Sequence, residues 1–180
     1  IRNVNFLTEG NIFQQGNQWD EYDSIHHKGL HFFYKDNLYL RPNTLANFNY
    51  IKPQEVYREQ DVQNTYASMG RLRALKYTNI NFSEVNKNDS TQLDANILMT
   101  KGKNQSLSFE IEGTNSAGDL GAAASMTFQH RNVFKGSETF TMKVRGAYEA
   151  ITGLQEGYEN DDYKEYGVES IIRIGSCGGY

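Results

Sequence analysis

The chain contains one cysteine, Cys177, and only two prolines among its 180 residues. A single thiol allows neither an internal disulfide nor a zinc cluster built on cysteines. No run approaches the roughly 18 or more apolar residues of a membrane-spanning helix. Basic charge is not in excess, because 22 acidic and 18 basic side chains leave a net charge of −4. This balance argues against a nucleic-acid binder, which usually carries a basic surface.

Tyrosine, phenylalanine and glycine are abundant, with 12, 10 and 16 copies. These residues favour sheets and turns over helix bundles. The sequence begins without an initiating methionine and without a basic region followed by an apolar signal segment. Residues 1–6 already alternate as a strand. We therefore expect the sequence to be a piece of a longer protein.

The segment 120–130 has the clearest strand pattern. Its even-numbered positions are apolar and its odd-numbered positions are small or polar. Such alternation predicts a strand with one apolar and one polar face. Its length fits the roughly 9–11 residues that cross a bilayer as a tilted strand. By itself the pattern also fits a strand of a soluble sheet.

Three further segments of the second half alternate in the same way, and they are 105–113, 139–149 and 166–174. The connections 113–119 and 150–164 are interpreted as long, glycine-containing loops, and 131–138 as a shorter turn with Phe134 at its tip. Long loops that alternate with short turns are typical of transmembrane barrels. The second half is therefore predicted to be a series of antiparallel hairpins.

The sequence pattern of the first half predicts two helices and three strands. The strands are expected at 1–7, 76–85 and 91–100, and the helices at about 42–48 and 58–75. The longer helix carries an apolar stripe with a 3.6-residue period, formed by Val62, Tyr66, Met69 and Leu72. We expect this stripe to be buried against one face of a sheet. The predicted fold class of this half is α+β.

Residues 8–38 are polar and show no sustained period, so we expect an insertion or a hairpin there. Three histidines in it, His26, His27 and His31, lie near acidic residues. Zinc sites usually show tighter motif spacing and a cysteine, so these histidines are predicted to be solvated loop residues that bind no metal. A catalytic group would be sought among Glu110, Glu112, Asp119 and His130, but no motif joins them. We expect neither catalysis nor a cofactor.

Two stretches resemble one protein family. TNSAGDLG at 114–121, followed by QHRNVFKGSE at 129–138, resembles the first barrel strands of Bacteroidetes-type members of the bacterial surface antigen family. This family comprises the BamA/TamA-type assembly factors. The segment 51–75 resembles the last polypeptide-transport-associated (POTRA) helix of that family with its lead-in. Family members often have Gly-Asp where this chain has Gln54-Glu55.

The resemblance implies a POTRA-like β-α-α-β-β unit at 1–103, with an insertion at about 8–38. Antiparallel hairpins at 104–174 would then begin a transmembrane β-barrel, and 175–180 would be a tail of unclear origin. The implied location is the outer membrane, with the POTRA part in the periplasm. The implied function is capture of unfolded β-barrel clients by β-augmentation and templating of their insertion. Implied partners are these clients, accessory assembly lipoproteins or periplasmic factors, and outer-membrane lipid, but no nucleic acid.

Three groups of residues follow as candidate sites. The first is an exposed edge strand for client binding, with Tyr77, Asn79, Asn81 and Ser83. The second is the strand at the lateral seam of the barrel, with Leu107, Phe109 and Ile111. The third is the family-motif turn, with Asn132, Phe134 and Gly136. We expect a proline at Asn79 or Asn81 to remove a donor from the edge.

Two other functions remain open at this point. A soluble β-rich periplasmic or surface binding module would explain the tyrosine content and the acidity equally well. A two-partner-secretion type transporter would share the same junction of domains. Detergent dependence separates the soluble module from a barrel, and client identity separates assembly from secretion. A sheet cut from its barrel would expose raw edges and an apolar face, so we expect oligomers that form through the barrel strands.

Overall fold

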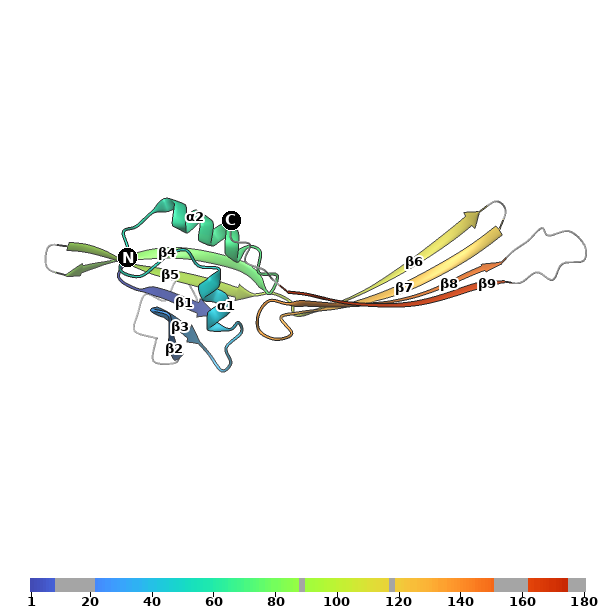
Figure 1. The fold of residues 1–180 in the computed structure, drawn as a ribbon, viewed down its shortest axis with the longest axis horizontal. Coiled ribbons are helices and arrows are strands. Elements are labelled where there is room, and N and C mark those ends of the chain that lie inside the picture. The colour runs from blue at the N-terminus through green and yellow to red at the C-terminus, as the bar shows by residue number, and fades with distance from the viewer. Residues whose placement is uncertain (9–21, 88–89, 117–118, 151–161, 175–180) are drawn as a thin grey trace, which may run out of the picture. The chain divides into compact units, whose positions relative to one another are not determined.

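The computed structural model describes residues 1–8, 22–87, 90–116, 119–150 and 162–174 (Figure 1). Its contacts divide the chain into two compact units. The first unit comprises residues 1–104, the turn 132–138 and the segment from Ile174 onward. The second unit comprises residues 105–131 and 139–173. No helix among the described residues is long and apolar enough to cross a membrane.

The first unit contains a mixed five-stranded sheet in the order β2-β3-β1-β5-β4. Its strands are β1 (Val4–Thr8), β2 (Asp23–His27), β3 (Leu30–Tyr34), β4 (Leu75–Lys87) and β5 (Ser90–Lys101). Strand β1 is parallel to both of its neighbours, β3 and β5, whereas β2 with β3 and β4 with β5 form antiparallel pairs. The two helices are α1 (Pro42–Asn47) and α2 (Glu59–Met69).

The predicted fold class, an α+β chain with a POTRA-like β-α-α-β-β unit, is wrong. The described chain is mainly β, with nine strands and two helices of 6 and 11 residues. Strands β2 and β3 form a hairpin in the stretch where an insertion or a hairpin was expected, and this hairpin is part of the sheet. Hydrophobic burial explains their place, because Phe32 of β3 is 1% exposed and stacks on Phe6 of β1 at 4.9 Å between ring centroids.

Helix α2 is shorter than the predicted helix 58–75, because it ends at Met69 with Gly70 as its C-cap. Glycine is a poor helix former, which favours an end at this position. Met69 and Leu72 are buried as predicted, and Val62 is partly buried against the core. Tyr66 is 39% exposed, so the prediction that it is buried is wrong.

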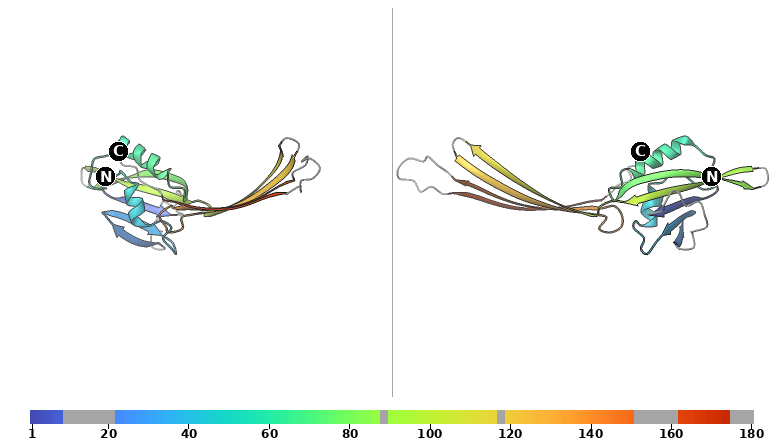
Figure 2. Two further views of the ribbon diagram at one scale, coloured as in Figure 1. Left: turned by 45° about the vertical axis from the view of Figure 1, so that its right-hand side comes forward. Right: turned by 180° about the vertical axis from the view of Figure 1, so that it is seen from behind.

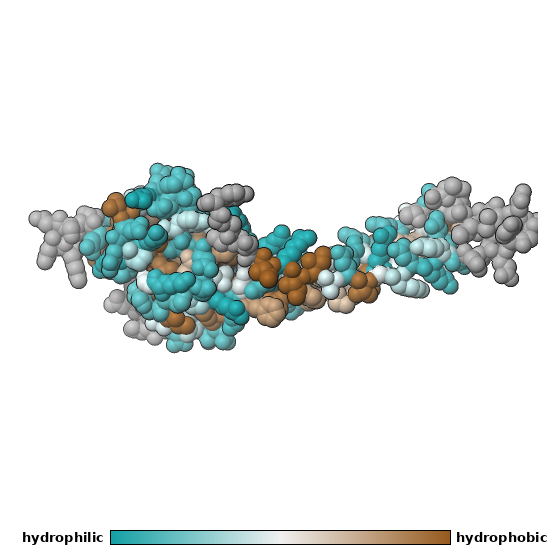
Figure 3. All heavy atoms as spheres, in the orientation of Figure 1, coloured by the Kyte–Doolittle hydropathy of each residue, from teal (hydrophilic) through white to brown (hydrophobic). Residues whose placement is uncertain are grey.

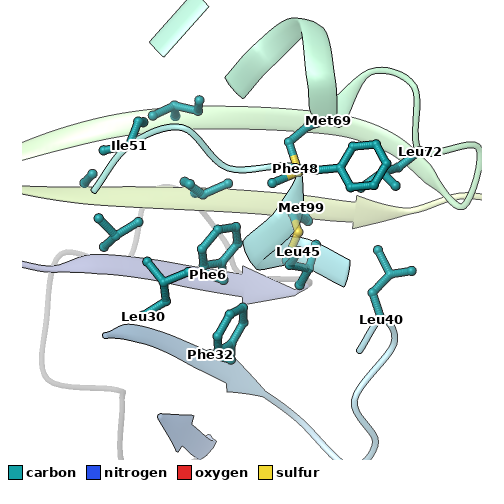
Figure 4. Packing of buried hydrophobic residues seen from close by; sticks show 14 of the residues in the cluster. Phe6, Leu30, Phe32, Leu40, Leu45, Phe48, Ile51, Met69, Leu72 and Met99 are labelled. Atoms are coloured by element: carbon teal, nitrogen blue, oxygen red, sulfur yellow. The ribbon is translucent and has the colours of Figure 1, made fainter. Parts of the chain in front are cut away.

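The hydrophobic core of the first unit lies between the sheet and the two helices (Figure 4). Phe6, Phe32 and Met99 come from the strands, while Leu45 and Met69 come from the helices. These side chains are all at most 3% exposed. The two helices therefore cover one face of the sheet (Figures 1 and 2).

The second unit is a four-stranded antiparallel sheet in the order β6-β7-β8-β9. Its strands are β6 (Gln105–Ser116), β7 (Asp119–Arg131), β8 (Thr139–Ala150) and β9 (Tyr163–Arg173). They run side by side as one layer (Figure 2). The four strands predicted from alternation are confirmed, and each of the first three extends beyond its predicted bounds.

The connections of this sheet differ from the predicted alternation of long and short loops. The loop expected at 113–119 is wrong, because β6 and β7 pair as far as Ser116 and Asp119 and leave only two residues between them. The connection 132–138 between β7 and β8 is the longer of these two. The expected loop at 150–164 falls largely on 151–161, and the expected tail on 175–180. Both of these stretches lie outside the described residues.

Candidate functional site: an amphipathic sheet, two strand edges and an anchored turn

One face of the second sheet is apolar across all four strands. Its register aligns Phe109 with Met126, Val144 and Val168 in one cross-strand row. Adjacent rows on the same face contain Leu107, Ile111, Phe128, Phe140, Met142 and Tyr166. Many of these side chains face solvent, with exposed fractions of 69% for Phe109 and 86% for Ile111. Apolar side chains at the surface of this unit are visible in Figure 3.

The opposite face of this sheet is polar and carries paired charges. Lys143 of β8 lies 3.7 Å from Glu110 of β6, and Arg145 lies 3.7 Å from Glu112. Strand β7 runs between these partners with small residues, and Ser125 donates a hydrogen bond of 3.1 Å to Glu110. Both ion pairs are solvent-exposed, so each adds only about 0–1 kcal/mol to stability in water.

Strand β6 forms one edge of this sheet, since within the sheet it pairs with β7 alone. The three residues predicted for a lateral seam, Leu107, Phe109 and Ile111, all lie on β6 and point to the apolar face. Each is at least 54% exposed. Among the residues that the structure describes, the outer backbone edge of β6 has no partner strand and lies beside exposed apolar side chains. Such an edge is a template for pairing with another strand.

Strand β4 is an edge strand of the first sheet. It carries the four residues predicted to bind clients: Tyr77, Asn79, Asn81 and Ser83. Ile80 is buried in the core, so alternation directs these four side chains away from it. Tyr77 is 61% exposed, whereas Asn79 and Asn81 are half-buried. The sheet therefore brings the four residues onto one face of one edge strand.

The backbone groups of Asn79 and Asn81 are nevertheless engaged within the sheet. The N–H of Ala95 in β5 donates to the Asn3 carbonyl at 2.9 Å, so odd-numbered β5 residues face β1 and even-numbered ones face β4. The even-numbered partners of Asn79 and Asn81 are Leu98 and Asn96. The prediction that Asn79 and Asn81 supply free edge donors is therefore wrong. A proline at either position would break the β4–β5 ladder.

The outward-facing backbone groups of β4 belong to the even-numbered residues, and Tyr66 of α2 covers one of them. Its hydroxyl accepts a hydrogen bond from the Ile80 N–H at 2.8 Å and donates one to Asn79 Oδ1 at 3.3 Å. At the next outward position, the ring of Tyr57 contacts Phe82 edge-on, with centroids 5.1 Å apart. Tyr66 thus occupies one outward-facing donor in the middle of this edge, which makes strand pairing there less favourable.

The turn 132–138 is held by its own polar groups. Asn132, Lys135 and Ser137 all have positive φ angles, between 60° and 68°. Positive φ is uncommon outside glycine, and asparagine tolerates it better than most residues. The Asn132 side chain stabilises the turn, because its Oδ1 accepts from the Ser137 N–H at 3.1 Å and its Nδ2 donates to the Tyr39 carbonyl at 2.8 Å.

Glu138 closes the same turn from inside. Its carboxylate accepts the N–H groups of Phe134 at 3.2 Å and Gly136 at 3.0 Å, and the residue is 9% exposed. A Cβ at Gly136 would lie 2.2 Å from Glu138 Oε1, so a larger residue at this position would force the Glu138 carboxylate to move. The predicted motif residues Asn132, Phe134 and Gly136 therefore belong to one turn, in which Phe134 is 54% exposed.

The three histidines lie on strands or at their ends, so the prediction of loop residues is wrong. His26 of β2 and His31 of β3 pair across the hairpin, with ring centroids 4.7 Å apart. Burial lowers the pKa of His31, the nearby His26 charge lowers it further, and Asp94 partly opposes both effects. In the described part of the chain, no group of three or more metal-binding side chains comes together.

Sequence patterns did not identify the edge cover or the hydrogen bonds that anchor the turn. Tyr66 fits the apolar stripe of its helix, and its hydroxyl contact with β4 depends on the sheet order. Asn132 and Glu138 are six residues apart, and the combination of asparagine, glycine and a closing glutamate was the available signal of a structured turn. The exposed apolar face, in contrast, follows directly from alternation.

No family model and no curated protein matches this chain. Among solved structures it is similar to BamA from Haemophilus ducreyi lacking POTRA domains 1-3, with 11% sequence identity and a TM-score of 0.43. The alignment covers 95% of this chain and 32% of that chain. The chain thus spans about a third of the length of that structure. At this identity and TM-score the likeness is one of fold at most and shows neither family nor function.

Proposed function

We propose that the second unit is part of the wall of a β-barrel in the outer membrane, with its apolar face toward lipid and its charged face toward the barrel interior. The amphipathic sheet carries this proposal. Lipid-facing and lumen-facing residues alternate in such barrels. Strands of 11 to 13 residues rise about 3.3 Å per residue. At a tilt of about 40° they span roughly 30 Å, the thickness of a bilayer core.

We further propose that the protein assists the insertion of other β-barrel proteins, the function that the sequence resemblance implies. The open edge of β6 supports this role. An incoming strand that pairs with β6 keeps its backbone N–H and C=O groups bonded while it enters lipid. The β4 edge suits strand capture less well, because Tyr66 covers its Ile80 N–H. Unfolded outer-membrane proteins are therefore the proposed partners of β6.

Single cysteines along β6 test the membrane location. Cys177 is first replaced by serine, and a spin label is then placed at residue 109, 110, 111 or 112 of the chain reconstituted in lipid vesicles. We expect labels at 109 and 111 to be accessible to oxygen, which partitions into lipid. Labels at 110 and 112 should be accessible to a water-soluble nickel chelate. Loss of this alternation, with all four labels in water, would instead support a soluble module.

Crosslinking tests the assembly role separately. A chemically unfolded outer-membrane barrel protein with single cysteines is added to vesicles that carry the chain with a cysteine at Phe109 or, as a matched edge control, at Val168 of β9. We expect disulfide crosslinks to Phe109 and faster folding of the client. Alternating labels without crosslinks or acceleration would leave a barrel segment with no assembly role. Release of the client into the vesicle interior would indicate a secretion transporter.

A further inference from the structure

Exposed basic residues surround the turn 132–138 in the first unit. The turn contributes Lys135, and three neighbouring segments contribute the other four members of this basic surface: Arg41, Arg71, Arg73 and Lys103. Two short contacts bring these segments together. The Arg41 N–H donates to the Lys135 carbonyl at 2.8 Å, and the residue after Arg73 donates its N–H to Ser137 Oγ at 3.1 Å.

The segment around Lys103 joins the same cluster through Ala74. The Gly102 N–H donates to the Ala74 carbonyl at 2.7 Å. The Tyr39 hydroxyl donates to the same carbonyl at 2.8 Å and lies 2.6 Å from Asn104 Oδ1. The ammonium of Lys101 lies 5.6 Å from the centre of the Tyr39 ring. Four backbone segments therefore converge where the five cations are exposed.

The charge of this surface is not neutralised nearby. Within the described ranges, none of the five cations has a carboxylate oxygen within 4.0 Å. The carboxylate of Glu138 is directed inward onto the N–H groups of Phe134 and Gly136. The tip of the turn exposes apolar side chains instead, with Val133 39% and Phe134 54% exposed. The surface thus combines positive charge with an apolar tip in a chain of net charge −4.

Two of the segments that carry this surface are continuous in sequence with strands of the second sheet. Gln105, His130, Phe140 and Ile172 form a single cross-strand row near that end. Lys103 precedes Gln105, the first residue of β6, by two positions. The turn 132–138 links β7 to β8 at the same end of the strands. In a membrane-spanning sheet, strand ends lie at the level of the lipid head groups.

We propose that this basic surface binds the head groups of anionic phospholipids, with Val133 and Phe134 dipping into the interface. The proposal rests on the proposed membrane location of the second unit. Basic residues close to an anionic membrane contribute about a fivefold gain in binding each. Their contribution falls with salt, whereas the contribution of a buried apolar face does not.

Vesicle flotation of the full chain tests the proposal. The probes are vesicles of phosphatidylcholine alone and vesicles that also contain phosphatidylglycerol, each at low and high salt. The test variant combines Arg73→Glu with Lys103→Glu. The control combines Lys52→Glu with Arg58→Glu, which reverses two exposed charges of the same unit away from the turn. Circular dichroism verifies that both variants keep the fold.

We expect a salt-sensitive preference of the unmodified chain for phosphatidylglycerol. The preference should fall at least about 30-fold in the test variant, since two charges are reversed, and it should persist in the control. An equal preference in chain and test variant, or an equal loss in the control, would overturn the proposal. Binding to phosphatidylglycerol vesicles alone would support the basic surface and contradict the barrel wall. Binding to neither vesicle would overturn both.

Discussion

Fifteen apolar side chains are buried in the core of the first unit, whereas Ala123 is the buried apolar residue among the described residues of the second. The second unit nevertheless has the longer strands on average, and three of them have 12 or 13 residues. Its large apolar side chains line one face of a single sheet and remain exposed. Large apolar side chains therefore point into a core in the first unit, whereas in the second unit they point outward from the sheet.

This difference shows where each unit obtains its stability. Burial of apolar surface contributes about 25 cal/mol per Å², and the first unit obtains this gain from its own helices and sheet. The second unit would obtain it only from an external apolar phase or a partner. In water its sheet depends on backbone hydrogen bonds and exposed ion pairs, each of which adds little net free energy.

The largest expected effect distinguishes the buried core of the first unit from the exposed apolar face of the second. Replacing Phe32 by alanine should lower the free energy of unfolding of the first unit by about 3–5 kcal/mol, because a fully buried ring leaves a cavity. Replacing Phe109 by alanine should change the stability in water by less than about 0.5 kcal/mol. Hydrogen exchange of amides in each unit measures both changes. A large loss on Phe109→Ala would mean that the apolar face is buried in water, for instance in an oligomer.

The anchored turn should show an intermediate effect. Replacing Ser137 by alanine removes the acceptor of the buried Ala74 N–H and should cost about 1–3 kcal/mol. The control is Ser125→Ala on the exposed face of the second sheet, for which we expect almost no change. Urea unfolding followed by far-ultraviolet circular dichroism compares the two. Equal effects would show that the turn is not anchored through Ser137.

A smaller effect is expected at the β4 edge. Replacing Tyr66 by phenylalanine keeps the ring and removes the hydroxyl that accepts from the Ile80 N–H. A loss of about 0.5–1.5 kcal/mol is expected for this bond, together with faster hydrogen exchange at Ile80. Tyr77→Phe serves as the control, because Tyr77 is 61% exposed on the same strand. Unchanged exchange at Ile80 would show that the edge is closed by other groups.

The smallest effect concerns pH. Burial and the His26 charge lower the pKa of His31 in the folded chain below 6.5, so the unfolded chain binds its proton more readily. Stability should be fully present above pH 6.5 and should decrease as pH falls through that value toward the folded pKa. His31→Asn should remove this part of the pH dependence in unfolding experiments. An increase of stability on acidification through the same range would contradict the prediction.

Strand positions in the second unit could be predicted because each strand contrasts an apolar face with a polar one. The fold of the first unit was harder to predict, because His26, His27 and their neighbours show no alternation, and Phe32 reveals its role only when Phe6 lies beside it. The predicted helix was longer than α2, because Leu72 continues the helical period although the helix ends at Met69.

The candidate sites show the same limit. The residues predicted for a seam lie on β6, and those predicted for a turn lie on the connection between β7 and β8, as alternation and turn residues indicated. The direction of backbone groups at Asn79 and Asn81 could not be read from the sequence, because it depends on which side of β5 pairs with β4. The closure of that edge by Tyr66 depends on the same pairing.

The charges on the polar face disfavour one of the two strand alignments next to the observed one. The apolar face repeats a large side chain at every second residue of β6, so a slip by two residues would keep it apolar. A slip that moves Glu110 to the row of Ala123 and Ala147 would move Glu112 to the row of Gly121 and Glu149, away from Arg145 and beside a second carboxylate. If β6 ever separates from β7 and closes again, these charges favour the original alignment over this slipped one.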